Sequence, residues 1–237
     1  MPMKTRELNV PISEQTVRSL AAGDLVFVNG TIYTLRDSAY ERTLTSLREG
    51  KSLPFSFKNT AIWHCGPIVR KTDSGWQVTA AGSTTSSRFT QPAAELLPKM
   101  GIRAIIGKGL MGDEILAPMR RWGACYLMTT GGAAAYYSRQ IARVVDVHWL
   151  DLGMPAAVWV FSVERLGPLL VGIDSQGRSV FESVRSAAQE NIAVVFEKLG
   201  IDPSHEYVWW PRPPSRFKDR NGRSVNASAT HARISKS

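Results

Sequence analysis

Short apolar runs alternate with polar or glycine-rich loops and with stretches of helical spacing along most of the chain. Runs of β-branched and aromatic residues predict strands, and apolar residues three and four positions apart predict helices. The predicted strands are 24–28, 31–35, 60–64, 76–81, 102–106, 124–130, 144–150, 157–164 and 169–173. The predicted helices are 93–100, 133–143 and 182–199. This alternation predicts an α/β domain over 23–201, with 1–22 as an N-terminal extension and 202–237 as a tail.

The domain is predicted to open with a β-hairpin. Asn29-Gly30 separates the first two strands, and this dipeptide readily supplies the positive φ angles of a tight turn. Ser38 and Glu41 follow with the spacing of a reciprocal helix cap. Arg36 therefore lies between a strand end and a helix start. On spacing alone its expected role is structural, in an ion pair with Asp37 or with Glu41.

A polar loop, Gly82-Ser83-Thr84-Thr85-Ser86-Ser87-Arg88-Phe89, follows the predicted strand 76–81. Its backbone N–H groups, its four hydroxyls and the planar guanidinium of Arg88 suit a carboxylate or a phosphate. Polar loops of this kind are also common as ordinary surface connections. Two similar loops elsewhere in the chain favour the anion-binding interpretation.

The second loop is Gly107-Lys108-Gly109, which follows the strand 102–106, and the third is Gly131-Gly132, which follows the strand 124–130. Glycines allow the backbone to approach a ligand closely, and Lys108 adds a positive charge. The second loop lacks the glycine spacing and the Ser/Thr of a Walker motif. Because ligands collect at the carboxyl ends of strands in open α/β sheets, we expect the three loops to share one face.

His64 ends the predicted apolar strand 60–64, and Cys65 follows it. His64 has the chemistry of a general base, but a single histidine in an apolar strand is more often a packed, hydrogen-bonded core residue. Cys65 has no nearby base in the sequence, which favours a buried thiol over a nucleophile.

The composition indicates a soluble globular protein. The chain has 237 residues, of which 43% are hydrophobic, enough to bury a substantial core. No apolar run approaches the ~20 residues that cross a bilayer, and residues 1–9 are too polar for a signal peptide, so we expect a cytoplasmic protein. Cys65 and Cys125 are the two cysteines, and their spacing fits neither a zinc site nor an iron–sulfur cluster. Any metal is therefore expected to come with another chain.

The net charge of +9 is concentrated at the end of the chain. Residues 212–237 carry a formal charge of +6, from seven basic residues against Asp219. Pro211 precedes the segment, Pro213 and Pro214 lie in it, and it has few aliphatic residues, which is typical of a disordered extension. A nucleic-acid-binding arm is the alternative, and the absence of an accompanying aromatic motif makes it the less favoured one.

Six motifs, in this order, resemble the β subunit or C-terminal domain of the iron–sulfur class I fumarases and L(+)-tartrate dehydratases. The similarity extends over about 23–181. The motifs are Thr31-Ile32-Tyr33-Thr34-Leu35-Arg36-Asp37, Ile62-Trp63-His64-Cys65-Gly66-Pro67-Ile68-Val69, 82–88, Gly107-Lys108-Gly109, Gly131-Gly132-Ala133-Ala134 and Leu152-Gly153-Met154-Pro155.

The resemblance implies a swivelling β/β/α domain and a hydro-lyase reaction, the reversible removal of water from a hydroxy-dicarboxylate. The expected reaction is malate to fumarate, or L-tartrate to oxaloacetate. It also implies a 4Fe-4S cluster held by a cysteine-bearing α subunit, so that this chain is active only in a hetero-oligomer. No metal ligand, membrane or nucleic acid is expected for this chain.

By match to the family motifs, Arg36, Arg88 and Lys108 would bind the substrate carboxylates. Thr84 would lie where the C–H proton is exchanged, with Lys108 as its catalytic neighbour, and Thr85 would help to hold the loop and the substrate. Two arginines and a lysine suit a dianion and the enediolate-like charge that grows as the proton leaves. An alcohol such as Thr84 is a poor base unless nearby cations lower its pKa.

Three positions depart from the family pattern, which usually has proline at Ser83, methionine at Phe89 and often glycine at Leu110. A leucine would be strained if position 110 required a positive φ. These departures support an alternative hypothesis, a non-enzymatic relative that binds a dicarboxylate or regulates a partner.

Overall fold

The computed structural model describes residues 4–73 and 75–202. The chain divides into two compact units, 1–186 and 187–237, and the sheet, the loops and all predicted site residues belong to the first. Of the second unit, the described part is the end of helix α6 (Val180–Leu199) and the residues up to 202. The predicted basic tail lies outside the described residues, apart from Asp202.

Within the described residues, seven strands form one mixed sheet in the order β1-β2-β3-β6-β7-β9-β8, and β4 pairs with β5 in a second sheet. Apolar and β-branched residues dominate the central strands, which are buried on both faces. The strands are β1 (Thr5–Asn9), β2 (Leu25–Thr34), β3 (Ala61–Trp63), β4 (Cys65–Thr72), β5 (Gly75–Ser83), β6 (Ala104–Gly107), β7 (Cys125–Met128), β8 (Ile141–His148) and β9 (Val158–Ile173).

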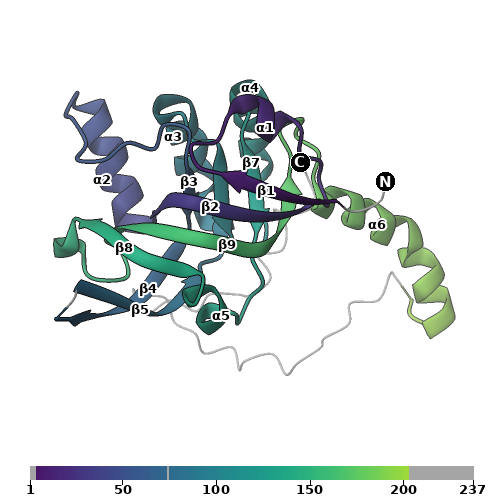
Figure 1. Cartoon of the computed structure of the whole chain (residues 1–237). Helices are drawn as coiled ribbons and strands as arrows, with labels where there is room; N and C mark the ends of the chain where they lie inside the picture. Colours follow the sequence, from purple (N-terminus) through teal and green to yellow (C-terminus); the bar gives the residue numbers. More distant parts are fainter. Residues whose placement is uncertain (1–3, 74, 203–237) are drawn as a thin grey trace, which may run out of the picture. The chain divides into compact units, whose positions relative to one another are not determined.

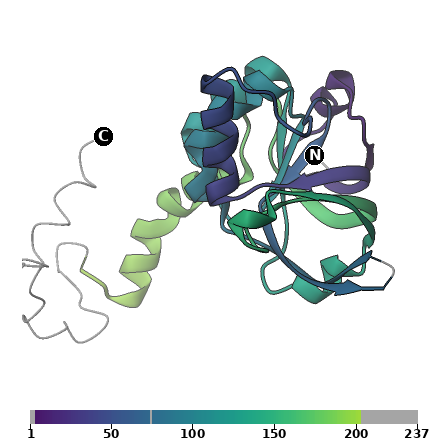
Figure 2. The same cartoon turned by 90° about the vertical axis from the view of Figure 1, so that its left-hand side faces the viewer.

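Helices α2, α3 and α4 cover one face of the large sheet, and β4, β5 and α5 lie on the other side (Figure 1). The view turned by 90° again shows α2 beside the next helices and away from the β4–β5 hairpin (Figure 2). The helices of this unit are α1 (Glu14–Arg18), α2 (Asp37–Arg48), α3 (Thr90–Met100), α4 (Leu116–Trp122), α5 (Ala134–Ser138) and the start of α6. This mixture of a sheet and helices confirms the predicted α/β class.

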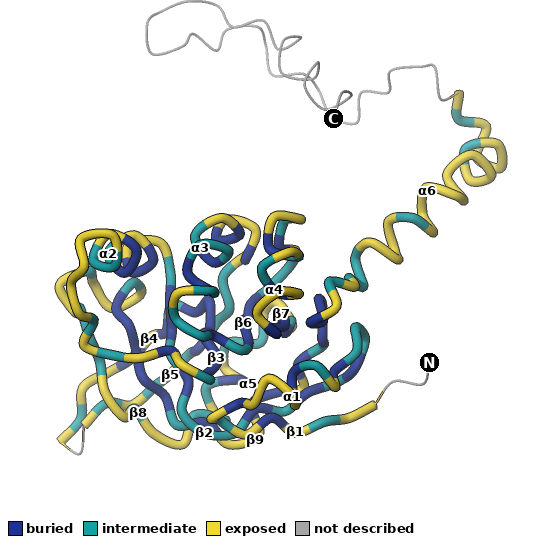
Figure 3. Tube along the Cα trace, turned by 90° about the horizontal axis from the view of Figure 1, so that it is seen from above, coloured by how far each residue is buried: buried dark blue, intermediate teal, exposed yellow. Residues whose placement is uncertain are grey.

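Two apolar cores lie on the two faces of the sheet. One packs α2, α3 and α4 against it and includes Tyr40, Leu96 and Met119. The other contains side chains of the sheet's opposite face, such as Trp159 and Phe161. The burial colouring shows the buried strand segments running between more exposed helices and loops (Figure 3). Among the described helices, none combines the length and the apolar character needed to span a bilayer.

The predicted opening hairpin is wrong, because β2 is one continuous strand through Asn29-Gly30. β2 pairs with β1 along one edge and with β9 along the other, and its register with β9 shifts between Val28 and Gly30. Gly30 therefore uses its φ of 104° in a β-bulge rather than in a turn. Because β9 also pairs with β7, the strands β2, β3, β6, β7 and β9 close into a ring.

The predicted cap at Ser38 is also wrong. Helix α2 begins at Asp37, and the carbonyl of Arg36 accepts the N–H of Tyr40 at 2.9 Å. The helix thus starts before Ser38, and the carboxylate of Asp37 lies in its first turn, where the helix dipole favours a negative charge.

Three further boundaries differ from the sequence predictions. Residues 5–20, assigned to an N-terminal extension, form β1 and α1 and bury Leu8, Ile12 and Val17 in the core. The helix predicted over 133–143 is only α5, because β8 pairs with β9 from Ile141 onward. The strands 157–164 and 169–173 are one strand, β9.

Candidate functional site

Four adjacent strands, β2, β3, β6 and β7, run parallel, so their carboxyl ends lie along one edge of the sheet. We call this the site edge. Arg36 follows β2, His64 follows β3, Lys108 follows β6 and Gly131 follows β7. The topology therefore brings together residues that are far apart in the sequence, as expected for a ligand site in an α/β protein.

The hydroxyl loop is attached to the site edge through its backbone. The N–H of Thr84 donates to the carbonyl of His64 at 2.6 Å, and the N–H of Ser86 donates to the carbonyl of Lys108 at 2.9 Å. The N–H of Lys108 donates to the carbonyl of Thr84 at 3.4 Å. Thr85 and Lys108 pair in an isolated parallel β-bridge. The predicted residues Thr84, Thr85 and Lys108 are therefore neighbours.

Arg36 and Arg88 meet at one carboxylate. An Nη2 atom of each guanidinium lies near Oδ2 of Asp37, at 3.3 Å for Arg36 and 3.5 Å for Arg88. The side chain of Arg88 is 52% exposed and also lies over the ring of Phe89, whereas that of Arg36 is 23% exposed. Two cations that share one anion leave a net positive charge for a ligand.

The guanidinium of Arg36 is held in a narrow space. A Cβ atom at Gly66 would overlap with its Nη1 atom, so the glycine allows this close approach. Its Nε atom is buried and has no hydrogen-bond partner among the described residues. A buried donor that is left unsatisfied is consistent with an acceptor supplied by a ligand.

Lys108 contributes a third cation at the site edge. Its aliphatic chain passes Gly131, where an added Cβ would lie 3.3 Å from Cδ of the lysine. Across the described part of the chain, no hydrogen bond or ion pair engages its ammonium group. The third predicted loop therefore contributes space for Lys108. It does not contribute a helix N-terminus suited to anions, because α5 is a single short turn of helix.

His64 is a packed core residue, as the favoured interpretation predicts. It is fully buried, Nε2 lies 2.8 Å from the hydroxyl of Tyr40, and Nδ1 lies 2.9 Å from the hydroxyl of Ser86. Burial lowers the pKa of His64 to about 3, so the imidazole is neutral at ordinary pH. Both nitrogens are occupied, which does not fit the alternative role of general base for a substrate.

The cysteines are buried, as predicted for Cys65. Burial raises the pKa of Cys65 well above its ordinary value and that of Cys125 to about 12. Fully buried thiols in an apolar core do not fit the role of cluster ligands. Among the residues that the structure describes, no group of three histidines, cysteines or carboxylates could hold a metal ion.

The structure shows the contacts or the backbone conformation of each of the three residues that depart from the family pattern. Ser83 accepts the indole N–H of Trp63 at 2.6 Å, and Phe89 stacks on Tyr40 with ring centroids 5.5 Å apart. Leu110 is not among the described non-glycine residues with positive φ, and Gly109 has the φ of 71°. The strain considered for Leu110 is therefore absent.

Sequence reasoning missed the partners that connect the site. The contact of Arg36 with Asp37 was one of its two alternatives and is confirmed, but the second contact, from Arg88 to Asp37, was not foreseen. The hydroxyls of Tyr40 and Ser86 on either side of His64 were also missed. No local pattern announces these contacts, because they join residues from different elements.

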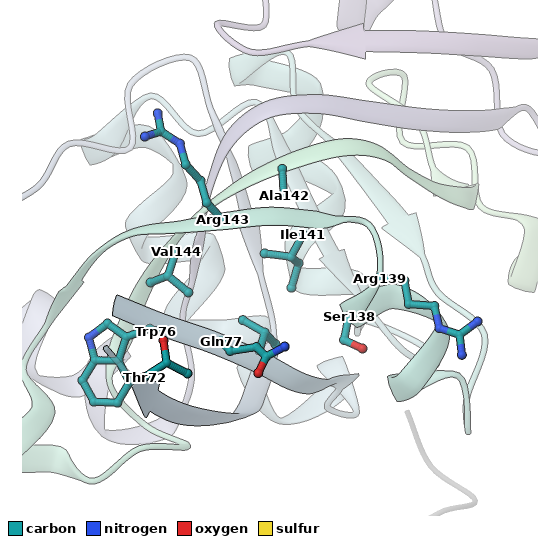
Figure 4. Close-up of a pocket in the computed structure, with 10 residues that line it drawn as sticks. Thr72, Trp76, Gln77, Ser138, Arg139, Ile141, Ala142, Arg143 and Val144 are labelled. Atoms are coloured by element: carbon teal, nitrogen blue, oxygen red, sulfur yellow. The ribbon is translucent and has the colours of Figure 1, made fainter. Parts of the chain in front are cut away.

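A groove lies elsewhere, between β5 and β8, and has a volume of about 520 Å³ (Figure 4). None of the predicted site residues lines it. Trp76 and Gln77 form one wall, and the side chains of Arg139 and Arg143 extend away from the groove. The groove contains none of the three cations that the topology brings to the site edge, so the site edge remains the better candidate.

Comparisons with known proteins identify the family of this chain. Residues 2–184 match the family model described as "Fumarase C-terminus". The chain is 38% identical to a Methanocaldococcus jannaschii protein provisionally named L(+)-tartrate dehydratase subunit beta, over 76% of this chain and 93% of that protein. It is 30% identical to the Escherichia coli L(+)-tartrate dehydratase subunit beta, over 81% of this chain and 94% of the relative. It is 37% identical to a protein of Geobacillus stearothermophilus provisionally named class I fumarate hydratase, of which it covers only 35%.

Proposed function

The chain belongs to the fumarase C-terminus family, and from this premise we propose that it is the β subunit of a hydro-lyase. Its substrate is a hydroxy-dicarboxylate, either malate, which gives fumarate, or L-tartrate, which gives oxaloacetate. The relatives support this class, since their names describe tartrate dehydratases and a fumarate hydratase. A cytoplasmic location is part of the same proposal.

The observation that carries the proposal is the convergence of three cations at the site edge. Arg36 and Arg88 meet at Asp37, and Lys108 is joined through its backbone to the loop that carries Arg88. A dicarboxylate brings two negative charges, and guanidinium groups bind carboxylates through paired N–H donors. The site therefore has the charge and the donors that such a substrate requires.

In the proposed reaction, the arginines exchange part of their contact with Asp37 for a substrate carboxylate. Lys108, whose ammonium is unengaged among the described residues, binds the second carboxylate or the charge that develops beside it. Loss of the C–H proton moves negative charge onto the adjacent carboxylate, and the cations stabilise that charge.

Thr84 is proposed to exchange the C–H proton, and Thr85 to hold the substrate and the loop. Thr84 is half-buried and Thr85 is exposed, and both adjoin Lys108. A neutral alcohol is a weak base, so this role requires that Lys108 or Arg88 lower the pKa of the hydroxyl in the complex.

The 4Fe-4S cluster of the family is proposed to belong to a cysteine-bearing α subunit. The described residues of this chain do not fit as its ligands, since both cysteines are buried and no other metal-binding group is present among them. The lengths of the relatives support a second chain. This chain covers nearly all of the proteins named subunit beta but about a third of the one named fumarate hydratase.

Exposed apolar side chains beside the site support a partner surface. Leu110, next to Gly109, is 51% exposed, and Ile68, close to Gly66 on β4, is 61% exposed. Large apolar side chains at the rim of a charged site are typical of surfaces that another protein covers.

The alternative of a non-enzymatic relative gains no support from the structure. Ser83 and Phe89 make contacts that tie the loop to the core, and Leu110 has an unstrained backbone. The choice between malate and tartrate depends on how the complete pocket treats one extra hydroxyl.

The test is to co-express the chain with its cysteine-bearing partner and to purify the complex without oxygen. Malate should give the ultraviolet absorbance of fumarate, or tartrate should give oxaloacetate. Iron–sulfur absorbance should accompany the complex and be absent from this chain alone after incubation with iron and sulfide. A stable, cluster-loaded complex that turns over neither substrate would contradict the proposal.

A further inference from the structure

Three buried polar side chains beneath the site edge form a continuous hydrogen-bonded series. The hydroxyl of Tyr40 on α2 lies 2.8 Å from Nε2 of His64, and Nδ1 of His64 lies 2.9 Å from the hydroxyl of Ser86. Beside the series, the buried phenol of Tyr126 on β7 donates to the carbonyl of Gly109 at 2.9 Å.

The hydroxyl of Tyr40 fixes the direction of both bonds. Among the described residues, Nε2 of His64 is its one hydrogen-bond partner, so the phenol proton has no other acceptor there. Tyr40 therefore donates to Nε2, which is unprotonated, and the ring proton of the neutral imidazole lies on Nδ1. Nδ1–H then donates to the hydroxyl of Ser86.

The series ends at Ser86, whose backbone is hydrogen-bonded to the loop that carries Lys108. The carbonyl of Gly109 lies directly after Lys108, and the carbonyl of Lys108 accepts the backbone N–H of Ser86 at 2.9 Å. A Cβ atom at position 107 would overlap with Oγ of Ser86 and lie 3.2 Å from Nδ1 of His64, so Gly107 makes room for the series. Ser86 also begins the turn that leads to Arg88.

We propose that Tyr40, His64 and Ser86 form one directional hydrogen-bond chain that, with the Tyr126–Gly109 hydrogen bond beside it, positions Lys108 and the loop 84–88, with His64 held as the Nδ1–H tautomer. These are positioning residues, since none of them is placed against the substrate. The kinetic part of the inference rests on the proposed hydro-lyase function, whereas the hydrogen-bond chain and its effect on the loop do not.

The tautomer is tested directly by nitrogen NMR of the full chain. The signals of the His64 ring nitrogens are identified as those that disappear from the spectrum of His64→Gln. The proposal expects the proton on Nδ1, and it expects this tautomer to persist from neutral to mildly acidic pH. A proton on Nε2, or a rapid mixture of the two tautomers, would overturn the direction of the chain.

The positioning effect is tested by amide hydrogen exchange at Ser86, whose N–H donates to Lys108. Tyr40→Phe removes the first donor and should speed this exchange about tenfold, the effect of losing roughly one buried hydrogen bond. Tyr33→Phe is the matched control, since it removes a phenol hydroxyl from a ring packed on Phe55 and Phe57, outside the chain. Equal exchange rates in the wild type and in Tyr40→Phe would overturn the positioning role.

Kinetics of the complex with the α partner provide the third readout. Tyr40→Phe and Ser86→Ala should each lower kcat about tenfold with less than a twofold change in KM. The double variant should lose little more than either single one, because a single break already interrupts the series. Unchanged kcat in both single variants would overturn the role in turnover. A wild-type complex without turnover would refute the proposed function instead, and NMR and amide exchange would still decide on the hydrogen-bond chain.

Discussion

The indole N–H of Trp63 donates a hydrogen bond to the hydroxyl of Ser83, with 2.6 Å between Nε1 and Oγ. Trp63 ends β3 and is fully buried, whereas Ser83 ends β5 in the smaller sheet. The bond therefore fastens the start of the hydroxyl loop to the strand that leads to His64. A proline at position 83 has no hydroxyl to take this role.

Ser83→Ala should lower the free energy of unfolding by about 1–3 kcal/mol, because it leaves the buried donor of Trp63 without an acceptor. Urea denaturation followed by tryptophan fluorescence measures the change. Ser87→Ala, in the same loop but exposed, is the control and should change stability by less than about 0.5 kcal/mol. Equal stability of the two variants would show that Ser83 is not a structural acceptor.

Arg88→Ala should abolish most turnover and leave the fold intact. The guanidinium is half-exposed and contacts only Asp37 and the ring of Phe89 among the described residues, so little packing is lost. Loss of a charged donor aimed at a developing negative charge typically costs about 100-fold or more in kcat. Turnover of the complex and thermal unfolding of the isolated chain are the two measurements.

The control for this variant is Arg48→Ala, which removes a surface arginine at the end of α2 that pairs with Glu95 on α3. It should retain both stability and activity. If Arg88→Ala instead unfolds the chain at ordinary temperature, Arg88 is a structural residue and its assignment to the site is lost.

Gly66→Ala should impair substrate binding by displacing Arg36. The added Cβ would overlap with Nη1 of the guanidinium and lie 3.0 Å from the carbonyl oxygen of Pro155, so the arginine must move. We expect KM to rise about tenfold, the cost of weakening one charge-assisted hydrogen bond. A double-mutant cycle gives the control. In an Arg36→Ala background, Gly66→Ala should have almost no further effect, and an additive loss would show that the methyl group acts elsewhere.

The sequence predicted the central strands and the site edge well, because both depend on local patterns. Apolar runs marked β6 and β7, and glycines marked the loops that follow them. The prediction of a hairpin at Asn29-Gly30 was wrong, because the positive φ of Gly30 suits a β-bulge as well as a turn. Pairing of β2 with both β1 and β9 decided between them, and pairing between distant strands is not visible in a local pattern.

The same limit explains what was found and missed at the site. Motif order identified Arg36, Thr84, Thr85, Arg88 and Lys108, but their roles still require the experiments above. The contact between Arg88 and Asp37 depends on how the loop folds back onto α2. The partners of His64 come from α2 and from the hydroxyl loop, so burial of the histidine could be predicted but its hydrogen bonds could not.

The buried histidine also has a consequence for stability at acidic pH. Burial lowers the pKa of His64 to about 3, whereas an unfolded histidine titrates near 6.5. Between these values the unfolded chain binds a proton that the folded chain excludes, so the free energy of unfolding falls as the pH falls. Tyr40, Tyr126 and Cys65 lie around the imidazole or beside it in the chain. Burial raises the pKa of each, so they stay neutral in this range.

From pH 7 to pH 5, this group alone should remove roughly 2 kcal/mol of stability, because each pH unit below the unfolded pKa costs about 1.4 kcal/mol. Urea denaturation of the wild type and of His64→Gln at both values isolates the contribution, since glutamine does not titrate. The variant should be less stable at pH 7, and its disadvantage should shrink by that amount at pH 5. His148→Gln changes a histidine outside the hydrogen-bond chain and should keep the full wild-type loss. A difference between wild type and His64→Gln that stays constant with pH would mean that the folded chain accepts the proton, and the imidazole would then not be locked as a neutral tautomer.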